Sequence, residues 1–307
     1  MFARWVKNRQ LIFQLAGTLL AVILLYMLLK DDGWNEIMNA FREIKTTDLL
    51  LVALLFLVSR IATVLRWHVL LRSGGIDMSL KNTAALTFTG LFASNFLPST
   101  IGGDVVRLAG AMQMGFDRAV CLASIAADRL IGMLGMSLTL PLGIAYSWSL
   151  LGSDTASLLT VVWFQRPRAF LKRTFYVFKI WLKKPASLFL SLGFGLIHMF
   201  CLFGSIYIFA DDLGGQISFW MVAGLWGLTY YITLLPISIN GYGLQELSFT
   251  FFMSNVAGLT PAVSLSVAVL IRAFFLLSSL PGAFFLPSIM AAMTKQRQAP
   301  PPDELLL

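Results

Sequence analysis

Seven ionisable side chains lie inside or beside apolar segments of this chain, where burying a charge is energetically costly. They are four arginines and three acids: Arg60, Arg107, Arg129, Arg272, Asp104, Asp128 and Glu246. A charge near the middle of a membrane helix costs about 2.5 to 3.5 kcal/mol on insertion scales. Ion pairing could offset that cost and lock the helices together. Because cations outnumber anions by one, the set also predicts a site for an anionic guest.

The chemistry that arginine favours is the binding of phosphate. Its planar guanidinium offers paired donors that match two phosphate oxygens. Helix N-termini can add backbone donors for the same group. A groove that is lined in this way and open to the bilayer would admit a lipid phosphate and leave the acyl chains outside. We therefore expect the charged residues to bind an anionic lipid headgroup.

The first candidate site is the stretch Asn95 to Arg107, which reads N-F-L-P-S-T-I-G-G-D-V-V-R. Pro98 disfavours helical geometry at the residue before it and lacks a backbone donor, so the preceding helix should end there. Irregular backbone at membrane depth survives only when it is buried in protein or lines a wet cavity. The binding residues predicted from this first break are Asn95, Ser99, Gly102, Gly103, Asp104 and Arg107.

A second break echoes the first. Leu234 to Glu246 reads L-L-P-I-S-I-N-G-Y-G-L-Q-E, and both stretches order an apolar run, Leu-Pro, a hydroxyl, glycines and an acid. In each half an arginine follows inside a later apolar helix, Arg129 in one and Arg272 in the other. Interrupted segments in corresponding places predict a site at the interface of two repeats; the alternative is chance. The second break adds Ser238, Asn240, Gly241, Gly243 and Glu246 to the predicted site.

Two further residues near the end of an apolar segment receive ordinary interpretations. Arg66 is expected to extend its charge to the membrane surface while its stem stays in apolar surroundings. Trp67 fits the belt of aromatic residues at the membrane interface.

Composition predicts a polytopic membrane protein. Of 307 residues, 58% are hydrophobic and 12% are charged, against roughly 25% charged residues in soluble domains. The net charge of +8 comes from short basic segments beside apolar ones, as the positive-inside rule requires. That placement favours anionic lipid surfaces as partners, and no nucleic-acid partner is expected. The inner (plasma) membrane is the predicted location, with both termini cytoplasmic.

The expected fold class is an all-α polytopic membrane helix bundle of about seven to nine hydrophobic segments, two of them broken or re-entrant. Residues 1–294 form one transmembrane domain, with halves at about 49–164 and 187–286, and residues 295–307 form a disordered cytoplasmic tail. The expected segments are Leu11–Leu29, Leu49–Leu71, Thr83–Leu97, Ala119–Tyr146, Ser187–Ala210, Phe219–Leu235, Leu244–Gly258 and Ala262–Leu286.

The motifs resemble those of a known family. R-W-H-V-L-L at Arg66, F-L-P-S-T-I-G-G-D-V-V-R at Phe96, D-R-L-I-G at Asp128 and L-P-I-S-I-N-G-Y-G-L-Q-E at Leu235 are similar to the membrane region of lysylphosphatidylglycerol synthases and related flippase-like proteins. The resemblance implies a multi-helix membrane fold that translocates a lipid across the bilayer. We expect no soluble transferase domain like that of the bifunctional members, so the resemblance does not carry aminoacylation over.

The expected function is binding and translocation of an anionic lipid, either a phospholipid or a polyprenyl-phosphate-linked sugar. No enzyme activity and no cofactor or metal is expected, since the acids are dispersed and no nucleotide-binding motif is present. Transport would be passive, ion-coupled or driven by consumption of product, with Asp128 and Glu246 as candidate proton carriers. Two alternatives stay open: an accessory subunit of a separate lipid-modifying enzyme, and an intramembrane lipid-phosphate transferase. The oligomeric state is not predicted.

Overall fold

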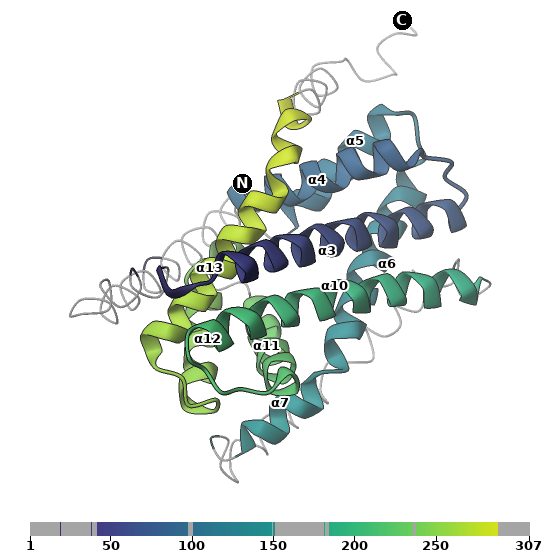
Figure 1. Ribbon diagram of the computed structural model, residues 1–307. Coiled ribbons are helices and arrows are strands. Elements are labelled where there is room, and N and C mark those ends of the chain that lie inside the picture. The colour runs from purple at the N-terminus through teal and green to yellow at the C-terminus, as the bar shows by residue number, and fades with distance from the viewer. Residues whose placement is uncertain are drawn as a thin grey trace, which may run out of the picture.

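The computed structural model describes residues 42–97, 101–148, 184–235 and 238–287, together with the single positions 19, 38, 150 and 181. Every regular element in these ranges is a helix, as Figure 1 shows, which confirms the predicted all-α class. Apart from position 19, the expected first helix Leu11–Leu29 lies outside the described residues, as do the segment 151–180 and the tail 295–307.

The helices keep the labels of Figure 1. The first group is α3 (Thr46–Ser73), α4 (Leu80–Phe96), α5 (Gly102–Gln113), α6 (Arg118–Ser137) and α7 (Leu140–Tyr146). The second is α10 (Pro185–Asp212), α11 (Phe219–Thr233), η1 (Ile239–Gly241), α12 (Leu244–Asn255), α13 (Pro261–Ser279) and η2 (Leu280–Phe284). In the described part, four helical stretches are long and apolar enough to cross a membrane: Thr46–Ser73, Arg118–Tyr146, Pro185–Asp212 and Pro261–Phe284.

Helices α3 and α10 form the longest contact of the bundle and run antiparallel (Figure 1). Lys45, just before α3, reaches Asp212 at the end of α10, with 2.9 Å between Nζ and Oδ1. At the other end Lys184 Nζ donates to the Ser73 carbonyl oxygen over 2.8 Å. The hydrogen bond to the Asp212 carboxylate raises the pKa of Lys45 above its usual value. Polar contacts thus hold both ends of the pair together.

The two breaks fall where the sequence predicts them. Helix α4 ends at Phe96, and Leu97 is extended with φ −85° and ψ 143°, as expected before a proline. Helix α4 has 17 residues and α11 has 15, whereas about 20 residues are needed to cross the hydrocarbon core. Each is therefore a short helix that is followed, after a break, by another short helix.

The expected single segment Ala119–Tyr146 is divided. Helix α6 ends at Ser137 and α7 begins at Leu140, with Pro141 near its start. Proline has no N–H, and its ring collides with the carbonyl four residues earlier, which here is that of Ser137. The proline therefore explains why the helix is interrupted at this position.

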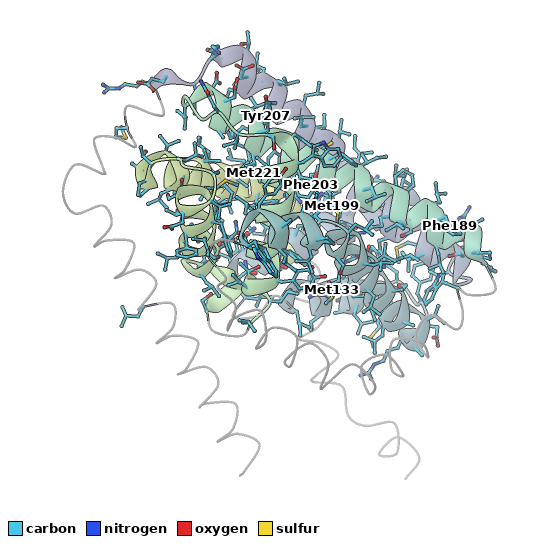
Figure 2. The ribbon with its side chains drawn as sticks, turned by 90° about the horizontal axis from the view of Figure 1, so that it is seen from below. Met133, Phe189, Met199, Phe203, Tyr207 and Met221 are labelled. Atoms are coloured by element: carbon cyan, nitrogen blue, oxygen red, sulfur yellow. The ribbon has the colours of Figure 1, made fainter. Side chains whose placement is uncertain are left out.

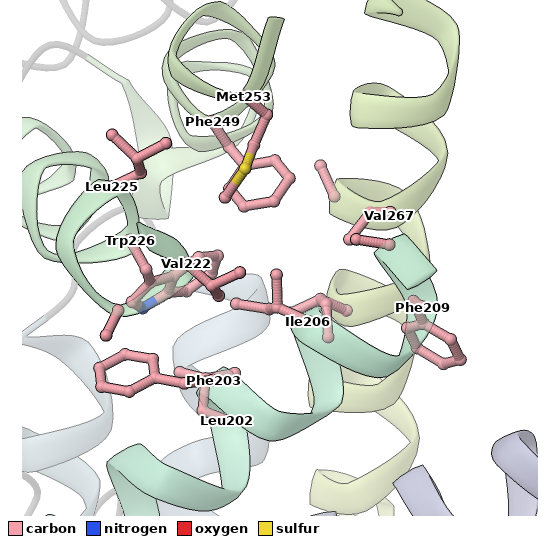
Figure 3. Close-up of a cluster of buried hydrophobic side chains, with 14 of the residues drawn as sticks. Leu202, Phe203, Ile206, Phe209, Val222, Leu225, Trp226, Phe249, Met253 and Val267 are labelled. Carbon is pink, nitrogen blue, oxygen red and sulfur yellow. The ribbon is translucent and has the colours of Figure 1, made fainter. Parts of the chain in front are cut away.

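The largest apolar core joins α10 to the later helices. Figure 3 shows Phe203 and Ile206 of α10 packed with Trp226 of α11, Phe249 of α12 and Val267 of α13. Figure 2 follows α10 along its length, and Phe189 near its start is 74% exposed while Phe203 is 3% exposed. Helix α10 thus carries apolar side chains toward both the interior and the surface, as a helix between a core and lipid should.

Candidate functional site

Asp104 and Arg107 enter the bundle from α5, which begins after the first break. The two residues share one helix face, as predicted, with 3.3 Å between Arg107 Nη1 and Asp104 Oδ1. Close packing of α5 on α4 holds this face inward. A Cβ on Gly103 would overlap the Gly90 carbonyl oxygen and the Ser94 hydroxyl, so the two backbones meet where only glycine fits.

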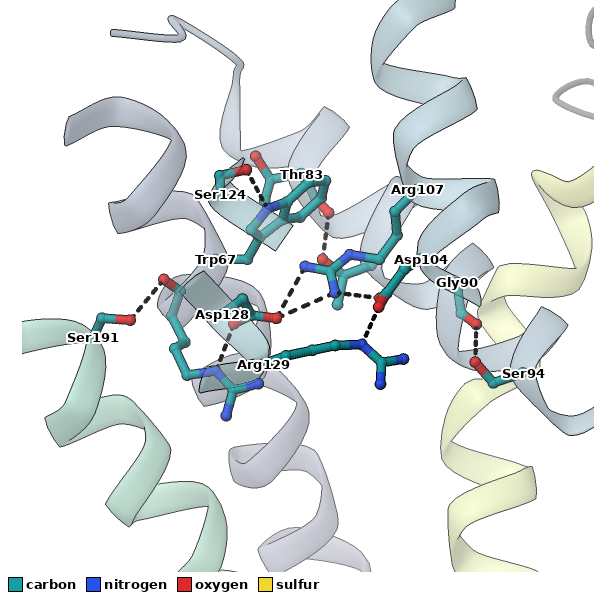
Figure 4. Close-up of polar contacts among 12 residues, drawn as sticks. Trp67, Thr83, Gly90, Ser94, Asp104, Arg107, Ser124, Asp128, Arg129 and Ser191 are labelled. Carbon is teal, nitrogen blue, oxygen red and sulfur yellow. Dashed lines mark hydrogen bonds and ion pairs between the residues drawn. The ribbon is translucent and has the colours of Figure 1, made fainter. Parts of the chain in front are cut away.

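Five charged side chains form a series of alternating sign across α3, α5 and α6 (Figure 4). Arg129 Nε pairs with Asp104 Oδ2. Arg107 joins Asp104 to Asp128, and both of its terminal nitrogens lie 3.2 Å from Asp128 Oδ2. Arg66 Nε donates to Asp128 Oδ1 over 2.6 Å. We call this series Arg129–Asp104–Arg107–Asp128–Arg66 the ion chain.

The centre of the ion chain is its least accessible part. Asp128 is 2% exposed and Arg107 is 8% exposed. Removing such ions from water costs several kcal/mol each, which attraction offsets only where the hydrogen bonds are well made. Asp128 accepts three, from two arginines. The Arg107 guanidinium also lies over the Trp67 ring, 4.0 Å from its centroid, in a cation–π contact.

The ion chain has one net positive charge, from three guanidiniums and two carboxylates. Both of its ends are arginines. Arg66 meets its carboxylate through Nε, and its Nη1 lies 3.3 Å from the place that a Cβ on Gly132 would take. Arg129 meets Asp104 through Nε, and its side chain is 38% exposed. An arginine therefore forms each end of the ion chain.

A cavity of about 250 Å³ lies against the ion chain, and all five members of the chain line it. Its walls come from α3, α4, α5, α6, α10 and α11. The other lining residues bring hydroxyls, an imidazole and apolar surface: Thr63, Thr87, Gly90, Leu91, Ser94, Gly103, Gly132, Met136, His198, Met199 and Tyr230. Such a site has a positive wall and several hydrogen-bonding groups, which suits a small anion.

Two expectations for α3 are wrong. The Arg66 side chain does not extend to the membrane surface, because it is 12% exposed and points inward to Asp128. Trp67 is fully buried, and its indole N–H donates to Ser124 Oγ over 3.1 Å. The reason is that α6 and α10 cover this part of α3, so its inner face is far from water. Sequence spacing gives no sign that Arg66 meets a carboxylate 62 positions away.

The residues of the second break gather around a second ion pair. Arg272 Nε donates to Glu246 Oε1 over 2.7 Å, and the Gly243 N–H donates to Oε2 over 2.8 Å. The Arg272 guanidinium lies 4.7 Å from the Tyr242 ring centroid and donates to the Gly241 carbonyl over 3.5 Å. These side chains do not line the cavity beside the ion chain.

The backbone of the second break turns through left-handed geometry. Asn240, Gly241 and Gly243 have φ of +49°, +74° and +76°. Glycine and asparagine adopt this region most readily. Ser238, just before the turn, is 5% exposed. In the structure these four predicted residues shape the start of α12, and none of them lines the cavity.

The two breaks touch each other. Tyr242 Oη donates to the Asn95 carbonyl oxygen over 3.2 Å, and Asn95 Nδ2 donates to Ser279 Oγ over 3.1 Å. Asn95 is thus a contact between the halves and not a cavity residue. Gly102, the first residue of α5, abuts Leu97, since a Cβ there would lie 2.6 Å from the leucine Cβ. Five residues of the breaks lie outside the described part of the chain: Pro98, Ser99, Thr100, Pro236 and Ile237.

Arg60 belongs to neither the ion chain nor the second ion pair. It is 5% exposed, and its Nε donates to Ser278 Oγ over 2.8 Å. Its guanidinium lies 5.3 Å from the Phe275 ring centroid and 5.9 Å from that of Phe56. No carboxylate within the described ranges pairs with it, and it does not line the cavity. Two aromatic rings and one hydroxyl therefore contact the Arg60 guanidinium, whereas the arginines of the ion chain contact carboxylates.

The ion pairs Asp104–Arg129 and Glu246–Arg272 occupy matching positions. Helices α5 and α12 each have 12 residues, and the acid is the third residue of each. The arginine is the twelfth residue of α6 and of α13. Each arginine pairs with the acid of its own half.

Most cavity residues outside the predicted set come from other helices, and two of them carry titratable side chains on α10 and α11. His198 and Tyr230 reach the cavity from α10 and α11. His198 Nδ1 lies 2.6 Å from Ser59 Oγ of α3. The sequence contains one signal for His198, a single imidazole in the middle of an apolar helix of 28 residues. Polar groups at such depth are costly and tend to be functional, so this histidine was a candidate. For Tyr230 no comparable signal exists.

Comparison with known proteins identifies a family whose sequence model matches this chain. The model described as "Lysylphosphatidylglycerol synthase TM region" matches residues 14–165 and 162–282. The matched ranges cover most of the chain and include the ion chain and the second ion pair. No match was found among curated proteins.

Proposed function

The chain belongs to the family of the lysylphosphatidylglycerol synthase TM region, and from this premise we propose that it binds an anionic lipid and translocates it across the bilayer. The observation that supports this most directly is the net positive ion chain along the cavity wall. A multi-pass membrane protein of a flippase-like family has a reason to keep such a charge at depth if its cargo is negative.

The size of the cavity fits a headgroup better than a whole lipid. Its volume of about 250 Å³ is below the roughly 300 to 1,000 Å³ of typical small-molecule sites. A phosphate would meet Arg66 and Arg129, whose planar guanidiniums match two oxygens at once. The Tyr230 hydroxyl can donate to a further phosphate oxygen, whereas the hydroxyls of Thr63 and Ser94 already donate to the carbonyls of Ser59 and Gly90. The acyl chains would stay in the surrounding lipid.

We further propose that the protein is not an enzyme. The acids at the cavity, Asp104 and Asp128, each contact two arginines. Carboxylate oxygens that already accept these bonds are poorly placed to accept a proton from a substrate. The arrangement suits recognition of charge rather than bond breaking.

We also propose that the two halves are an internal repeat with two broken segments. The support is the matched register of the two ion pairs and the contact between Tyr242 and Asn95, which brings the breaks together. Transporters built from repeats bind their substrate near such interrupted helices. The inner (plasma) membrane remains the proposed location, with both termini cytoplasmic and membrane lipids as partners.

The decisive experiment compares Arg129→Gln with Arg272→Gln. Both arginines are the twelfth residue of a long helix and pair with an acid, yet only Arg129 lines the cavity. We expect the purified protein to carry an anionic lipid that mass spectrometry identifies. Arg129→Gln should lower its occupancy about tenfold or more, the size expected for losing one charge-assisted contact, while Arg272→Gln should retain it. Equal loss in both variants would contradict the cavity assignment.

Translocation needs its own measurement. The protein is reconstituted in liposomes that contain fluorescent phosphatidylglycerol or, in parallel, fluorescent phosphatidylcholine. Faster inward and outward movement of the anionic lipid, lost in Arg129→Gln, is the expected result. Binding without movement would instead favour an accessory subunit that presents lipid to a separate enzyme.

A further inference from the structure

His198 of α10 contacts α3 and lines the cavity. It is the fourteenth of the 28 residues of α10, so it lies near the middle of a candidate membrane span. Its Nδ1 is 2.6 Å from Ser59 Oγ, which fixes the ring against α3. Its second nitrogen, Nε2, has no hydrogen-bond partner among the described residues, and the residue lines the cavity. A neutral imidazole so placed can still take up a proton.

Asp128 and Glu246, the two acids expected to carry protons, already accept hydrogen bonds from other groups. Asp128 accepts three hydrogen bonds from Arg66 and Arg107. Glu246 uses one oxygen for Arg272 and the other for the Gly243 N–H. Protonating either acid would leave buried arginines without their partners, which is strongly unfavourable. Among the titratable groups that line the cavity, His198 can change charge without breaking the ion chain.

The charges around His198 link its protonation to an anion. Arg60 and Arg66 of α3 and Asp128 of α6 are the charged groups that act on the ring. Other neighbouring elements bring Tyr230 of α11, Arg129 of α6, and Asp104 and Arg107 of α5, all at the cavity. Helix α13 brings Arg272, which Glu246 neutralises. When the cavity is empty, the two cations oppose a further positive charge and the one anion only partly offsets them. A phosphate in the cavity reverses that balance.

We propose that His198 takes up one proton when an anionic phosphate headgroup binds and releases it when the headgroup leaves. This rests on the function proposed above. The proton passes from solvent to an imidazole nitrogen, the imidazolium N–H donates to a phosphate oxygen, and the proton returns to solvent after the lipid departs. A lipid that crosses the bilayer in this form carries one proton with it, which would couple transport to the proton gradient.

The test counts protons. Dioctanoyl phosphatidylglycerol is titrated into the full chain in detergent by calorimetry, in two buffers of different ionisation enthalpy, from pH 6 to pH 8. We expect a net uptake of up to one proton per bound lipid within this range. Affinity should fall by up to about tenfold per pH unit as pH rises through the imidazole titration. Dimethyl phosphate, a diester that stays a monoanion throughout this range, is titrated in parallel, and a headgroup site predicts the same proton count at lower affinity.

Matched variants separate this role from a structural one. His198→Gln should bind with a proton count near zero and with affinity that hardly depends on pH. His68→Gln removes the other histidine, which bonds to Thr83 Oγ1 at 3.0 Å and does not line the cavity, and it should keep the wild-type count. Ser59→Ala removes the interhelical bond and retains the imidazole, so its count should also persist.

The outcomes are distinguishable. Lipid binding without proton uptake in the wild type, or wild-type uptake in His198→Gln, overturns this inference and leaves the proposed function standing. If His198→Gln does not fold, the count in His68→Gln decides, since His198 is then the last histidine of the chain. No lipid binding by the wild type at any pH overturns both proposals.

Discussion

At the scale of single residues, Asp128 is the member of the ion chain with the most partners. Arg66 bonds one of its oxygens and Arg107 the other, so both arginines depend on one carboxylate. The carboxylate is 2% exposed, so water cannot replace it. Its removal would leave two guanidiniums without compensation at that point.

Asp128→Asn is therefore expected to destabilise the protein by about 3 to 5 kcal/mol, the usual effect of breaking one partner out of a buried ion pair. The measurement is thermal or denaturant unfolding of the purified protein in detergent. Asp77→Asn provides the matched control, because Asp77 pairs with Arg72 at the surface and its side chain is 86% exposed. Exposed pairs contribute little, so that variant should unfold like the wild type. Equal stability of the two variants would refute the ion chain.

The residue-scale predictions succeeded where the contact was local. Asp104 and Arg107 are three positions apart, so helical geometry alone places them on one face. Their link to Asp128 and that of Asp128 to Arg66 join helices far apart in the sequence. Helical periodicity carries no information on which helices meet, and the role of Arg66 was therefore missed.

At the scale of elements, the site depends on how closely α5 approaches α4. Gly103 touches the Gly90 carbonyl, and Gly90 in turn lies against the Arg107 stem, where a Cβ would be 2.7 Å from Cγ. These two glycines set the position from which Arg107 reaches Asp128. The geometry of the ion chain is thus a consequence of a backbone contact.

Gly103→Ala should destabilise the protein by about 1 to 3 kcal/mol through overpacking and weaken lipid binding, because α5 must move outward and take Arg107 with it. Unfolding and lipid occupancy are measured on the same samples. Gly193→Ala is the control, since a Cβ there meets nothing within 4 Å. Alanine in that helix should be neutral or stabilising by about 0.5 to 1 kcal/mol. If Gly103→Ala were as stable as Gly193→Ala and bound lipid equally well, the close α4–α5 contact would be contradicted.

Helix positions and both breaks could be predicted from apolar runs, prolines and glycines, because these signals are local. The division of Ala119–Tyr146 was missed although Pro141 is visible in the sequence, since prolines are tolerated in many membrane helices. The cavity itself could not be predicted. Its walls combine six helices, and only their packing shows that the first break lines it while the second does not.

At the scale of the whole molecule, the antiparallel pair α3 and α10 fixes which loops share a side of the membrane. The loop after α3 holds Asp77, and the loop after α10 holds Gln216, both exposed. Because the helices run in opposite directions, these loops lie at opposite ends of the bundle. The positive-inside rule assigns the first loop to the cytoplasm.

Single cysteines test that arrangement. In cells, Gln216→Cys should react with a membrane-impermeant thiol reagent, whereas Asp77→Cys should react only after permeabilisation. Cys121 and Cys201 are buried and should contribute little background. The wild-type chain serves as the control for that background. Labelling of both cysteines from the same side would contradict the antiparallel arrangement.

The matched positions in the two halves carry different kinds of side chain. The sixth residue is Arg107 in α5 but Phe249 in α12, and the eleventh is Asp128 in α6 but Ile271 in α13. Phe249 and Ile271 are 1% and 0% exposed and belong to the large apolar core. The first half therefore places charged side chains and a cavity at positions where the second half packs apolar side chains. Under the repeat proposed above, substitutions at the cavity of the first half would leave the apolar core around the second half intact.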